Sequence, residues 1–266
     1  MNLLFCFNRD CLGQFVCCMR SILQHGGYDH YHVYILHTFV ERELEEAIGR
    51  DFGDAVTFHF IRMEEELFAQ FPTTDRYPPE IYYRLAAPLL LPEGLDRILY
   101  LDTDLVVINS LRELYETDFE GNYYVGCTHT REFMTRLNRA RLGASEDAAY
   151  INTGVLLMNL PVLRKVIRME EICDFAQRQK LVLPDQDILS ALYGDRVKLV
   201  DTLRYNLSDR ILTIYNAEHT RHPIDVDWVR QNGVIVHYCG RNKPWKDGYT
   251  GKLGIFYREL LPQESQ

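Results

Sequence analysis

The sequence of 266 residues lacks the features that define several common protein classes. None of its seven cysteines forms a C-x-x-C pair, and their odd number argues against a complete disulfide framework or a zinc knuckle. No run approaches the roughly 18 apolar residues of a membrane-spanning helix. The 29 Lys and Arg residues against 38 Asp and Glu give a formal net charge of −9. Bulk charge therefore argues against a protein that coats nucleic acid or anionic membrane.

The N-terminal segment also lacks the marks of a signal peptide. Residues 3–7 are apolar but short, no basic residue precedes them, and Asn8-Arg9-Asp10 follows directly. Cys17 and Cys18 lie in an apolar run, where free cysteine behaves as a small buried hydrophobe. A reducing environment is the simplest interpretation. We therefore expect a cytoplasmic protein that contacts the inner face of a membrane at most transiently.

An alternation of strand and helix patterns occupies the first hundred residues. The expected elements are strands at 3–7, 31–37 and 56–61, helices at 12–23 and 41–52, a helix at 80–91 and a strand at 97–101. This β-α-β-α-β order predicts a parallel sheet with helices on both faces. In such sheets ligands bind outside the carboxyl ends of the strands, and residues 8–10 lie at one such end.

The later part of the chain is less regular. We expect a strand at Val155–Met158, an amphipathic helix at Leu163–Gln179 and a loop-rich lobe at Asn206–Asp227. No internal repeat, low-complexity tract or linker indicates independent domains, so a single domain is predicted.

Two aspartates, Asp102 and Asp104, follow the predicted strand at 97–101. In extended backbone, residues i and i+2 point to the same side, so both carboxylates are expected to converge on one cation. Carboxylate oxygens suit Mg²⁺ or Mn²⁺. A D-x-D tripeptide alone is frequent and usually a solvated turn. The apolar strand in front favours a site, because it places the acids at the ligand-binding edge of the sheet.

A second strand pattern at residues 234–236 leads into His237 and then into a loop with Gly240 and Lys243. A lone histidine is more often a hydrogen-bonded structural residue than a ligand. The following glycine and lysine, however, suit a loop that wraps a phosphate. An imidazole added to two carboxylates shifts the metal preference from Mg²⁺ toward Mn²⁺.

Two other polar segments have ordinary structural explanations. The polar trio 152–154 could cap a loop, and its amide and hydroxyl groups could equally bind sugar hydroxyls. The segment Pro184-Asp185-Gln186 is a good helix start, and Asp185 as an N-cap is a sufficient explanation by itself.

In this order, the four segments resemble the retaining glycosyltransferase family 8, which includes bacterial lipopolysaccharide galactosyl- and glucosyltransferases and the glycogenins. The matching segments are residues 97–104, 150–159, 184–189 and 237–245, and the resemblance runs from about Met1 to Tyr257. It implies a GT-A fold of the α/β class with one mixed, mainly parallel sheet. A Rossmann-like nucleotide-binding half, about residues 1–110, would be fused to an acceptor-binding half, about residues 111–258.

The resemblance also implies a metal and a phosphate site. At the matching positions, Asp102, Asp104 and His237 resemble Mn²⁺ ligands, with Mg²⁺ as the alternative ion. Lys243 and the backbone of Gly240 would contact the diphosphate of the donor.

The remaining donor contacts follow in the same way. Asn8 would lie beside the uracil, and Arg84 would face the donor. Asn152 and Asp185 would hold the transferred sugar, and Gln186 resembles the residue on the β-face of the anomeric carbon. These last three are therefore the candidate catalytic residues. Thr130 stands where related galactosyltransferases have an aspartate.

The resemblance implies Mn²⁺-dependent transfer of a hexose, glucose or galactose, from a UDP-sugar to a hydroxyl of a glycan or glycolipid. One alternative is a nucleotidyltransferase or hydrolase of sugar nucleotides. That class normally has a glycine-rich basic loop after the first strand, where this chain has only Gly13, placed late. The other alternative is a catalytically silent sugar-nucleotide-binding protein. No nucleic-acid partner is expected, and the sequence leaves the oligomeric state open.

Overall fold

The computed structural model describes residues 1–75 and 77–261, which divide into two compact units. Unit 1 comprises residues 1–9, 30–102 and 117–200, and unit 2 comprises residues 10–29, 103–116 and the chain from 201 onward. Each unit is thus assembled from three chain segments. This division does not coincide with the predicted nucleotide-binding and acceptor-binding halves, whose functional assignment stays a prediction.

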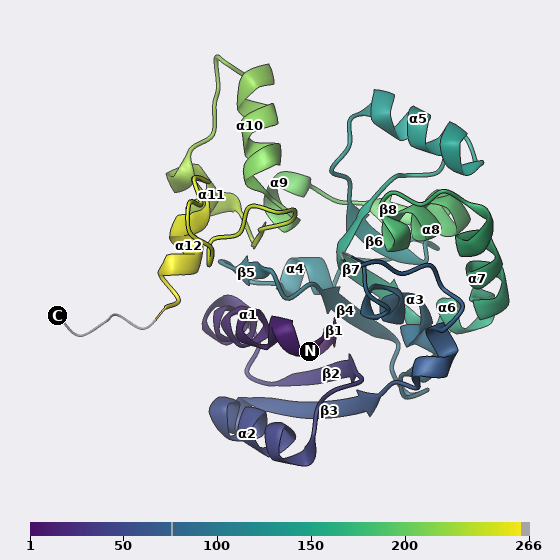
Figure 1. The fold of residues 1–266 in the computed structure, drawn as a ribbon. Coiled ribbons are helices and arrows are strands. Elements are labelled where there is room, and N and C mark those ends of the chain that lie inside the picture. Colours follow the sequence, from purple (N-terminus) through teal and green to yellow (C-terminus); the bar gives the residue numbers. More distant parts are fainter. Residues whose placement is uncertain (76, 262–266) are drawn as a thin grey trace. The chain divides into compact units, whose positions relative to one another are not determined.

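Unit 1 contains a seven-stranded sheet in the order β3-β2-β1-β4-β7-β6-β8 (Figure 1). The strands are β1 (Asn2–Cys6), β2 (Tyr31–His37), β3 (Val56–Arg62), β4 (Arg97–Leu101), β6 (Tyr124–Cys127), β7 (Asn152–Asn159) and β8 (Val197–Leu199). Strands β1 to β4 pair in parallel, β7 is antiparallel to both β4 and β6, and β8 is parallel to β6. The predicted mixed, mainly parallel sheet is confirmed.

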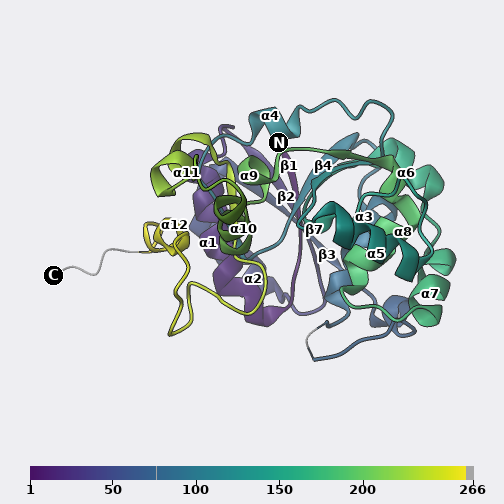
Figure 2. The same cartoon turned by 90° about the horizontal axis from the view of Figure 1, so that it is seen from above.

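Helices cover this sheet on both sides. They are α2 (Arg42–Phe52), α3 (Glu80–Leu90), α5 (Glu132–Leu142), α6 (Leu160–Val166), α7 (Met169–Arg178) and α8 (Pro184–Tyr193), with 3₁₀ turns at Gly53–Ala55, Glu65–Phe68 and Gly194–Arg196. Helices α3, α6, α7 and α8 gather on one side (Figure 2), where α8 contacts both α3 and α7. Helix α2 packs against the edge strand β3.

The central strands β1, β4 and β7 of unit 1 are apolar on both faces. Alternate residues such as Leu4, Tyr100 and Leu156 pack in one buried cluster with side chains of α3 and α6 to α8. The intervening residues, such as Leu3 and Leu99, point to the opposite face and are fully buried as well. This double burial explains why the strands appear in the sequence as continuous apolar runs.

Unit 2 is built around a two-stranded antiparallel pair, β5 (Leu105–Val107) and β9 (Ile235–His237). Its helices are α1 (Leu12–His25), α4 (Arg112–Tyr115), α9 (Thr202–Tyr205), α10 (Asp209–Glu218), α11 (Val226–Asn232) and α12 (Gly254–Arg258), and a 3₁₀ turn at Arg9–Cys11 precedes α1. A second buried cluster includes Val106, Leu207, Val236 and Phe256. The Val107 N–H donates to the Ser21 hydroxyl at 2.9 Å, which joins β5 to α1.

Several predicted elements have the expected bounds, but the helix predicted at Leu163–Gln179 is wrong. The segment forms two helices, α6 and α7, separated at Ile167 and Arg168, where the backbone is extended. Ile167 is buried in the unit 1 cluster, and the extended backbone lets it stay there while the chain changes direction. A single hydrophobic periodicity therefore concealed two helical axes.

The loop-rich lobe predicted at Asn206–Asp227 is also wrong, because helix α10 and the start of α11 lie there. Two polar residues of this segment are helix N-caps, and only its residues 206–208 and 219–225 lie outside helices. The Ser208 hydroxyl accepts from Ile211 N–H at 3.3 Å, and the Asp225 carboxylate accepts from Trp228 N–H at 2.8 Å.

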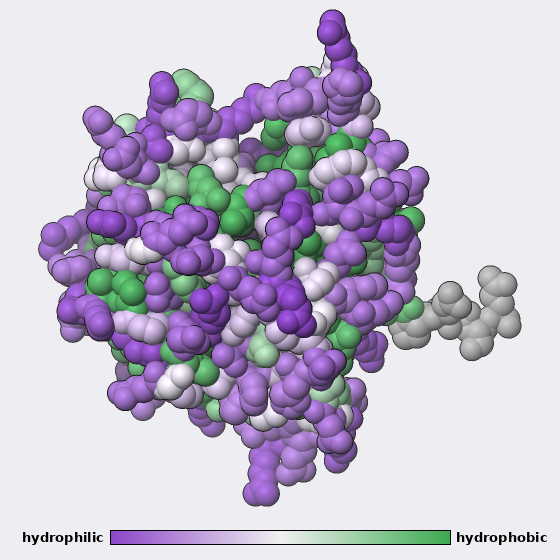
Figure 3. Space-filling view, turned by 180° about the vertical axis from the view of Figure 1, so that it is seen from behind, coloured by the Kyte–Doolittle hydropathy of each residue, from purple (hydrophilic) through white to green (hydrophobic). Residues whose placement is uncertain are grey.

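Within residues 1–75 and 77–261, no helix has both the length and the apolar character required to cross a bilayer. On the face drawn in Figure 3, hydrophilic residues prevail and hydrophobic ones form separate groups among them.

Candidate functional site

The two aspartates of the D-x-D motif lie where the chain turns from β4 to β5. Strand β4 ends at Leu101 and β5 begins at Leu105, with a bend at Thr103 and Asp104. The expectation that both aspartates continue an extended strand is therefore wrong. The two carboxylates are brought together by this bend and not by the side-chain alternation of a strand.

Within unit 2, strand pairing brings Asp104 to His237. The register of β5 and β9 sets Leu105 opposite His237, so Asp104 precedes the paired position by one residue. An Asp104 carboxylate oxygen lies 3.0 Å from Nε2 of His237, and the imidazole is buried. The other ring nitrogen, Nδ1, lies 2.8 Å from Oδ1 of Asn206. The order of the strands thus joins residues 133 positions apart in the sequence.

The contact with Asn206 determines which nitrogen of His237 is available to a ligand. Because the amide oxygen only accepts, Nδ1 must donate its proton to it. In a neutral ring Nε2 then carries the lone pair, and it faces a carboxylate oxygen that is also an acceptor. A cation satisfies two facing acceptors, and the hydrogen bond behind the ring is the usual support of a metal-bound histidine.

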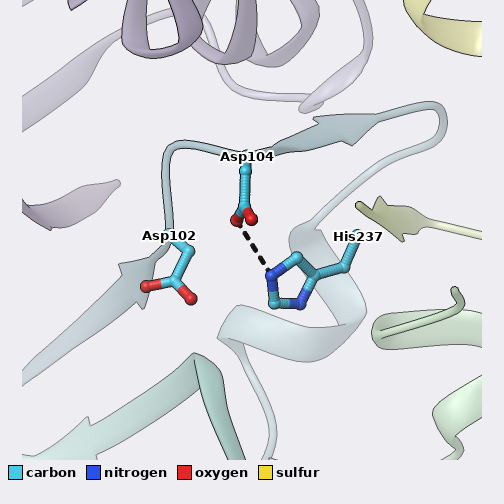
Figure 4. A group of neighbouring side chains, drawn as sticks. All are labelled: Asp102, Asp104 and His237. Carbon is cyan, nitrogen blue, oxygen red and sulfur yellow. Dashed lines mark hydrogen bonds and ion pairs between the residues drawn. The ribbon is translucent and has the colours of Figure 1, made fainter. Parts of the chain in front are cut away.

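Asp102 adds a third donor atom, a second carboxylate oxygen, since a single residue separates it from Asp104. One potential ligand atom from each of Asp102, Asp104 and His237 lies within 4.8 Å of the others (Figure 4). Two carboxylates and one imidazole are a donor set suited to Mn²⁺ and also compatible with Mg²⁺. The residues therefore fit a divalent metal ion.

Lys243 lies beside the carboxylate of Asp104. Its Nζ donates to Asp104 and, at 2.8 Å, to the carbonyl oxygen of Tyr238. Burial alone raises the pKa of Asp104, but the charges and hydrogen bonds of His237 and Lys243 outweigh it and hold that pKa well below its usual range. Gly240 begins this loop with φ of +92°, a backbone conformation that favours glycine.

Within unit 1, Arg84 of α3 is the buried cation that organises the end of β4. Its Nη1 lies 3.1 Å from carboxylate oxygens of both Asp102 and Asp185, and 3.1 Å from the carbonyl oxygen of Thr153. The guanidinium carbon lies 4.3 Å from the ring centre of Tyr100, whose hydroxyl donates to Asp102 at 2.6 Å. Burial lowers the pKa of Arg84, but the two carboxylates outweigh burial and raise that pKa above its usual value. Arg84 therefore stays charged.

The residues predicted to hold the sugar lie on β7 and α8. Asp185 accepts from the Thr153 hydroxyl at 2.5 Å, and burial raises the pKa of its carboxyl despite the opposing charge of Arg84. The N-cap of α8 is Leu183, so the alternative role of Asp185 as an N-cap is wrong. Asn152 is buried and accepts from the Gly154 N–H at 3.1 Å, whereas Gln186 is half-buried.

A buried charge next to these residues escaped sequence reasoning. Asp187 is fully buried and accepts hydrogen bonds from Arg141 at 2.6 and 3.0 Å and from the Tyr150 hydroxyl at 2.7 Å. It also accepts from the backbone N–H groups of Val182 and Leu183. Arg141 lies 46 positions away, and no sequence spacing signals the pair. Asp187 therefore fixes α5 and the first turn of α8 to one another.

Tyr100 and Asn206 also escaped sequence reasoning, although each holds a predicted site residue in place. Thr153, in the polar trio 152–154, donates its hydroxyl proton to Asp185. Two predicted contact residues, in contrast, retain unused hydrogen-bonding capacity. Among residues 1–75 and 77–261, Oδ1 of Asn8 and Nε of Arg84 are buried and have no hydrogen-bond partner, and the same holds for Oε2 of Glu80 and the hydroxyl of Tyr193. Because buried polar atoms are nearly always satisfied, such atoms have capacity left for a water molecule or a polar ligand.

Comparison with known proteins identifies relatives of the whole chain. The sequence model described as "Glycosyl transferase family 8" matches residues 2–248. A lipopolysaccharide 1,2-glucosyltransferase of Escherichia coli is 25% identical over 249 residues, which cover 91% of this chain and 72% of that protein. A lipopolysaccharide 1,3-galactosyltransferase of Salmonella typhimurium is 25% identical over 215 residues, or 75% of this chain and 58% of that protein.

The fold has a close counterpart among solved structures. The galactosyltransferase LgtC, in complex with donor and acceptor sugar analogues, superposes with a TM-score of 0.79 and 24% sequence identity. The superposition covers 99% of this chain and 98% of that one. The predicted GT-A fold is confirmed.

The Asn206 contact predicts that Asn206→Ala weakens metal binding. Without an acceptor behind Nδ1 the imidazole of His237 loses its fixed tautomer, and Mn²⁺ affinity should fall by about 10- to 100-fold. Mn²⁺ titration followed by electron paramagnetic resonance measures this. Asn206→Asp keeps an acceptor and should bind as the native chain does. The exposed Asn232→Ala variant is the control, and equal affinities in all three variants would contradict the role of Asn206.

The buried position of Asp187 predicts that Asp187→Asn destabilises the protein by about 3 kcal/mol, because the cation of Arg141 loses its charge partner and an amide NH₂ replaces one of the two oxygens that accept hydrogen bonds. Urea unfolding measures the change. Glu132→Gln, which breaks an exposed ion pair on the same helix α5, should cost less than about 1 kcal/mol. Equal losses in the two variants would show that Asp187 is not the structural anchor.

Proposed function

This chain belongs to glycosyl transferase family 8 and is a sugar-nucleotide-dependent glycosyltransferase, and we propose that it transfers a hexose from a UDP-sugar with retention at the anomeric carbon. The observation that carries the proposal is the group Asp102, Asp104 and His237 with Lys243 beside it. These residues combine a metal donor set with a cation for phosphate. A sugar-nucleotide diphosphate requires both.

We assign the metal as Mn²⁺. The imidazole of His237 favours Mn²⁺ over Mg²⁺, and its orientation by Asn206 suits a ligand whose lone pair points outward. When bound, the metal would supply Lewis-acid stabilisation of the negative charge on the diphosphate. A cation at Asp104 competes with Lys243 for that carboxylate. Lys243 can then turn its ammonium toward the phosphate, as proposed for the Gly240 loop.

The nucleotide end of the donor is assigned to Asn8. Its buried Oδ1, without a partner, is an acceptor for the N3–H of uracil, a group that a cytosine base lacks. This argument supports UDP as the nucleotide portion of the donor.

The sugar end is assigned to Asn152, Asp185 and Gln186. Arg84 and Thr153 hold the carboxylate of Asp185 in one orientation, so it can accept hydrogen bonds from sugar hydroxyls without reorganising. Arg84 contacts Asp102 as well, which ties the sugar-binding carboxylate to one of the proposed metal ligands. Preorganisation of this kind lowers the cost of stabilising charge as the sugar separates from the diphosphate.

We propose that transfer occurs by front-face attack. The bond from C1 to the β-phosphate oxygen breaks with its electron pair on that oxygen. The acceptor hydroxyl attacks C1 from the same face, and its proton passes to the departing phosphate oxygen. Gln186 is a neutral amide and a poor nucleophile, and Asp185 already binds Thr153 and Arg84. Neither is therefore assigned as a covalent nucleophile.

The acceptor is assigned as a glycan or glycolipid, because the relatives of Escherichia coli and Salmonella typhimurium act on lipopolysaccharide. Those two relatives transfer glucose and galactose, which we take as the donor sugars for this chain. Among the described residues no disulfide joins any of the seven cysteines, which supports a cytoplasmic location, where thiols stay reduced.

The proposed donor chemistry predicts Mn²⁺-dependent hydrolysis of a UDP-sugar. The native protein should release UDP, not pyrophosphate, from UDP-glucose or UDP-galactose in preference to their N-acetylated forms. Asp104→Asn should lower the rate by at least about 100-fold, because it removes a charged ligand. Asp174→Asn, an exposed aspartate of α7, should leave the rate unchanged. Full activity of Asp104→Asn without added metal would overturn the metal assignment.

Front-face attack predicts that no sugar becomes attached to the enzyme. Mass spectrometry of peptides from α8, taken after rapid mixing with the donor, should show no hexose on Asp185 or Gln186. The anomeric configuration of the product, measured by nuclear magnetic resonance, should be that of the donor. A hexose adduct that forms and decays at the turnover rate would replace this mechanism with double displacement.

A further inference from the structure

Helix α5 turns apolar side chains toward solvent. Phe133, Met134 and Leu137 are 70%, 46% and 48% exposed. Phe133 and Leu137 are four residues apart, so they lie on the same side of the helix, with Met134 next to them. A surface helix normally turns its apolar side to the core. Here the residues that face inward are Thr135 and Leu142, which are buried.

The same helix is locally basic although the chain is acidic. Residues 131–141 contain four arginines and one acidic residue, Glu132. Arg131 and Arg136 are exposed, and Arg136 pairs with Glu132 at 3.1 Å across an exposed surface. Exposed pairs of this kind contribute little energy, so this positive charge remains available to an anionic partner.

We propose that this face of α5, formed by Phe133, Met134, Leu137 and Arg136, binds the surface of an anionic lipid bilayer. Aromatic and aliphatic side chains enter the boundary between headgroups and acyl chains, and arginines beside them remain at the level of the lipid phosphates. The combination of exposed apolar side chains with flanking arginines matches this environment. The net charge of −9 opposes this contact only weakly, because salt screens the repulsion from charges more than roughly 10 Å away.

A second copy of the chain fits this face less well. Three partly exposed side chains form a small apolar surface, whereas each partner of a stable interface contributes about 800 Å². Contact between two copies through the same face would also set Arg136 of one copy near Arg136 of the other. A bilayer needs no matching surface and supplies the opposite charge.

Bilayer contact through α5 would also place the proposed sugar site near lipid-anchored acceptors, an inference that rests on the proposed function. Arg141 near the end of α5 binds Asp187, two residues after Asp185, and Thr135 bonds to Thr130 at 2.9 Å. Helix α5 is therefore fixed within unit 1 to the turn that carries the proposed sugar ligands. A glycolipid acceptor embedded in the same bilayer would enter beside them.

Co-sedimentation with lipid vesicles tests the proposal. The native protein should bind vesicles of phosphatidylcholine with a minority of phosphatidylglycerol, and bind pure phosphatidylcholine more weakly. Phe133→Ser should weaken binding by about tenfold, and Arg136→Gln by about fivefold. The matched control is Leu199→Ser on β8, because Leu199 is 49% exposed and lies outside α5.

The result that would overturn the proposal is an absence of binding to the anionic vesicles, or equal binding by Phe133→Ser and Leu199→Ser. Loss of a dimer in Phe133→Ser, seen by analytical ultracentrifugation, would assign the face to self-association and also overturn it. Hydrolysis of the UDP-sugar without vesicles should be the same in Phe133→Ser as in the native protein. Hydrolysis and vesicle binding are separate measurements, so either proposal can fail while the other stands.

Discussion

The buried guanidinium of Arg84 is the interaction on which the sugar-binding part of the structure depends. It neutralises Asp102 at the end of β4 and Asp185 at the start of α8, two carboxylates that an apolar interior would otherwise reject. Burial raises the pKa of Asp185, and the charge of Arg84 opposes that rise. The sheet and the helix can meet at this point because one positive charge serves both.

In unit 2 the equivalent constraint is strand pairing. The register of β5 and β9 decides which residue faces Asp104, and a slip by one position would turn His237 to the other face of the pair. Asn206 then fixes the ring, and Lys243 closes over the carboxylate from the following loop. The pairing of β5 with β9 thus brings together residues that are far apart in the sequence.

The sequence predicts the parallel strands and their helices well, because double burial and helical periodicity are local signals. Strands at 31–37 and 97–101 have the predicted bounds. The two axes of α6 and α7 were not predictable, since the break at Ile167 preserves the apolar pattern. The capping roles of Ser208 and Asp225 were likewise hidden, because a cap and a loop use the same residue types.

For the site, the metal donor set could be predicted because its residues follow apolar strands. The residues that orient His237, Asp185 and the first turn of α8 could not. Asn206, Thr153 and Arg141 act through partners between 31 and 46 positions away, and such contacts leave no periodic trace in a single sequence. Their roles become visible only when hydrogen-bond partners are assigned in space.

The contacts of Asp187 also set a boundary for protein engineering. A chimera that replaced residues 132–150 with the equivalent segment of a relative, to change the acceptor, would exchange both Arg141 and Tyr150. A graft that lacked either side chain would leave a fully buried carboxylate short of donors. The transferable module is therefore this segment together with the first turn of α8.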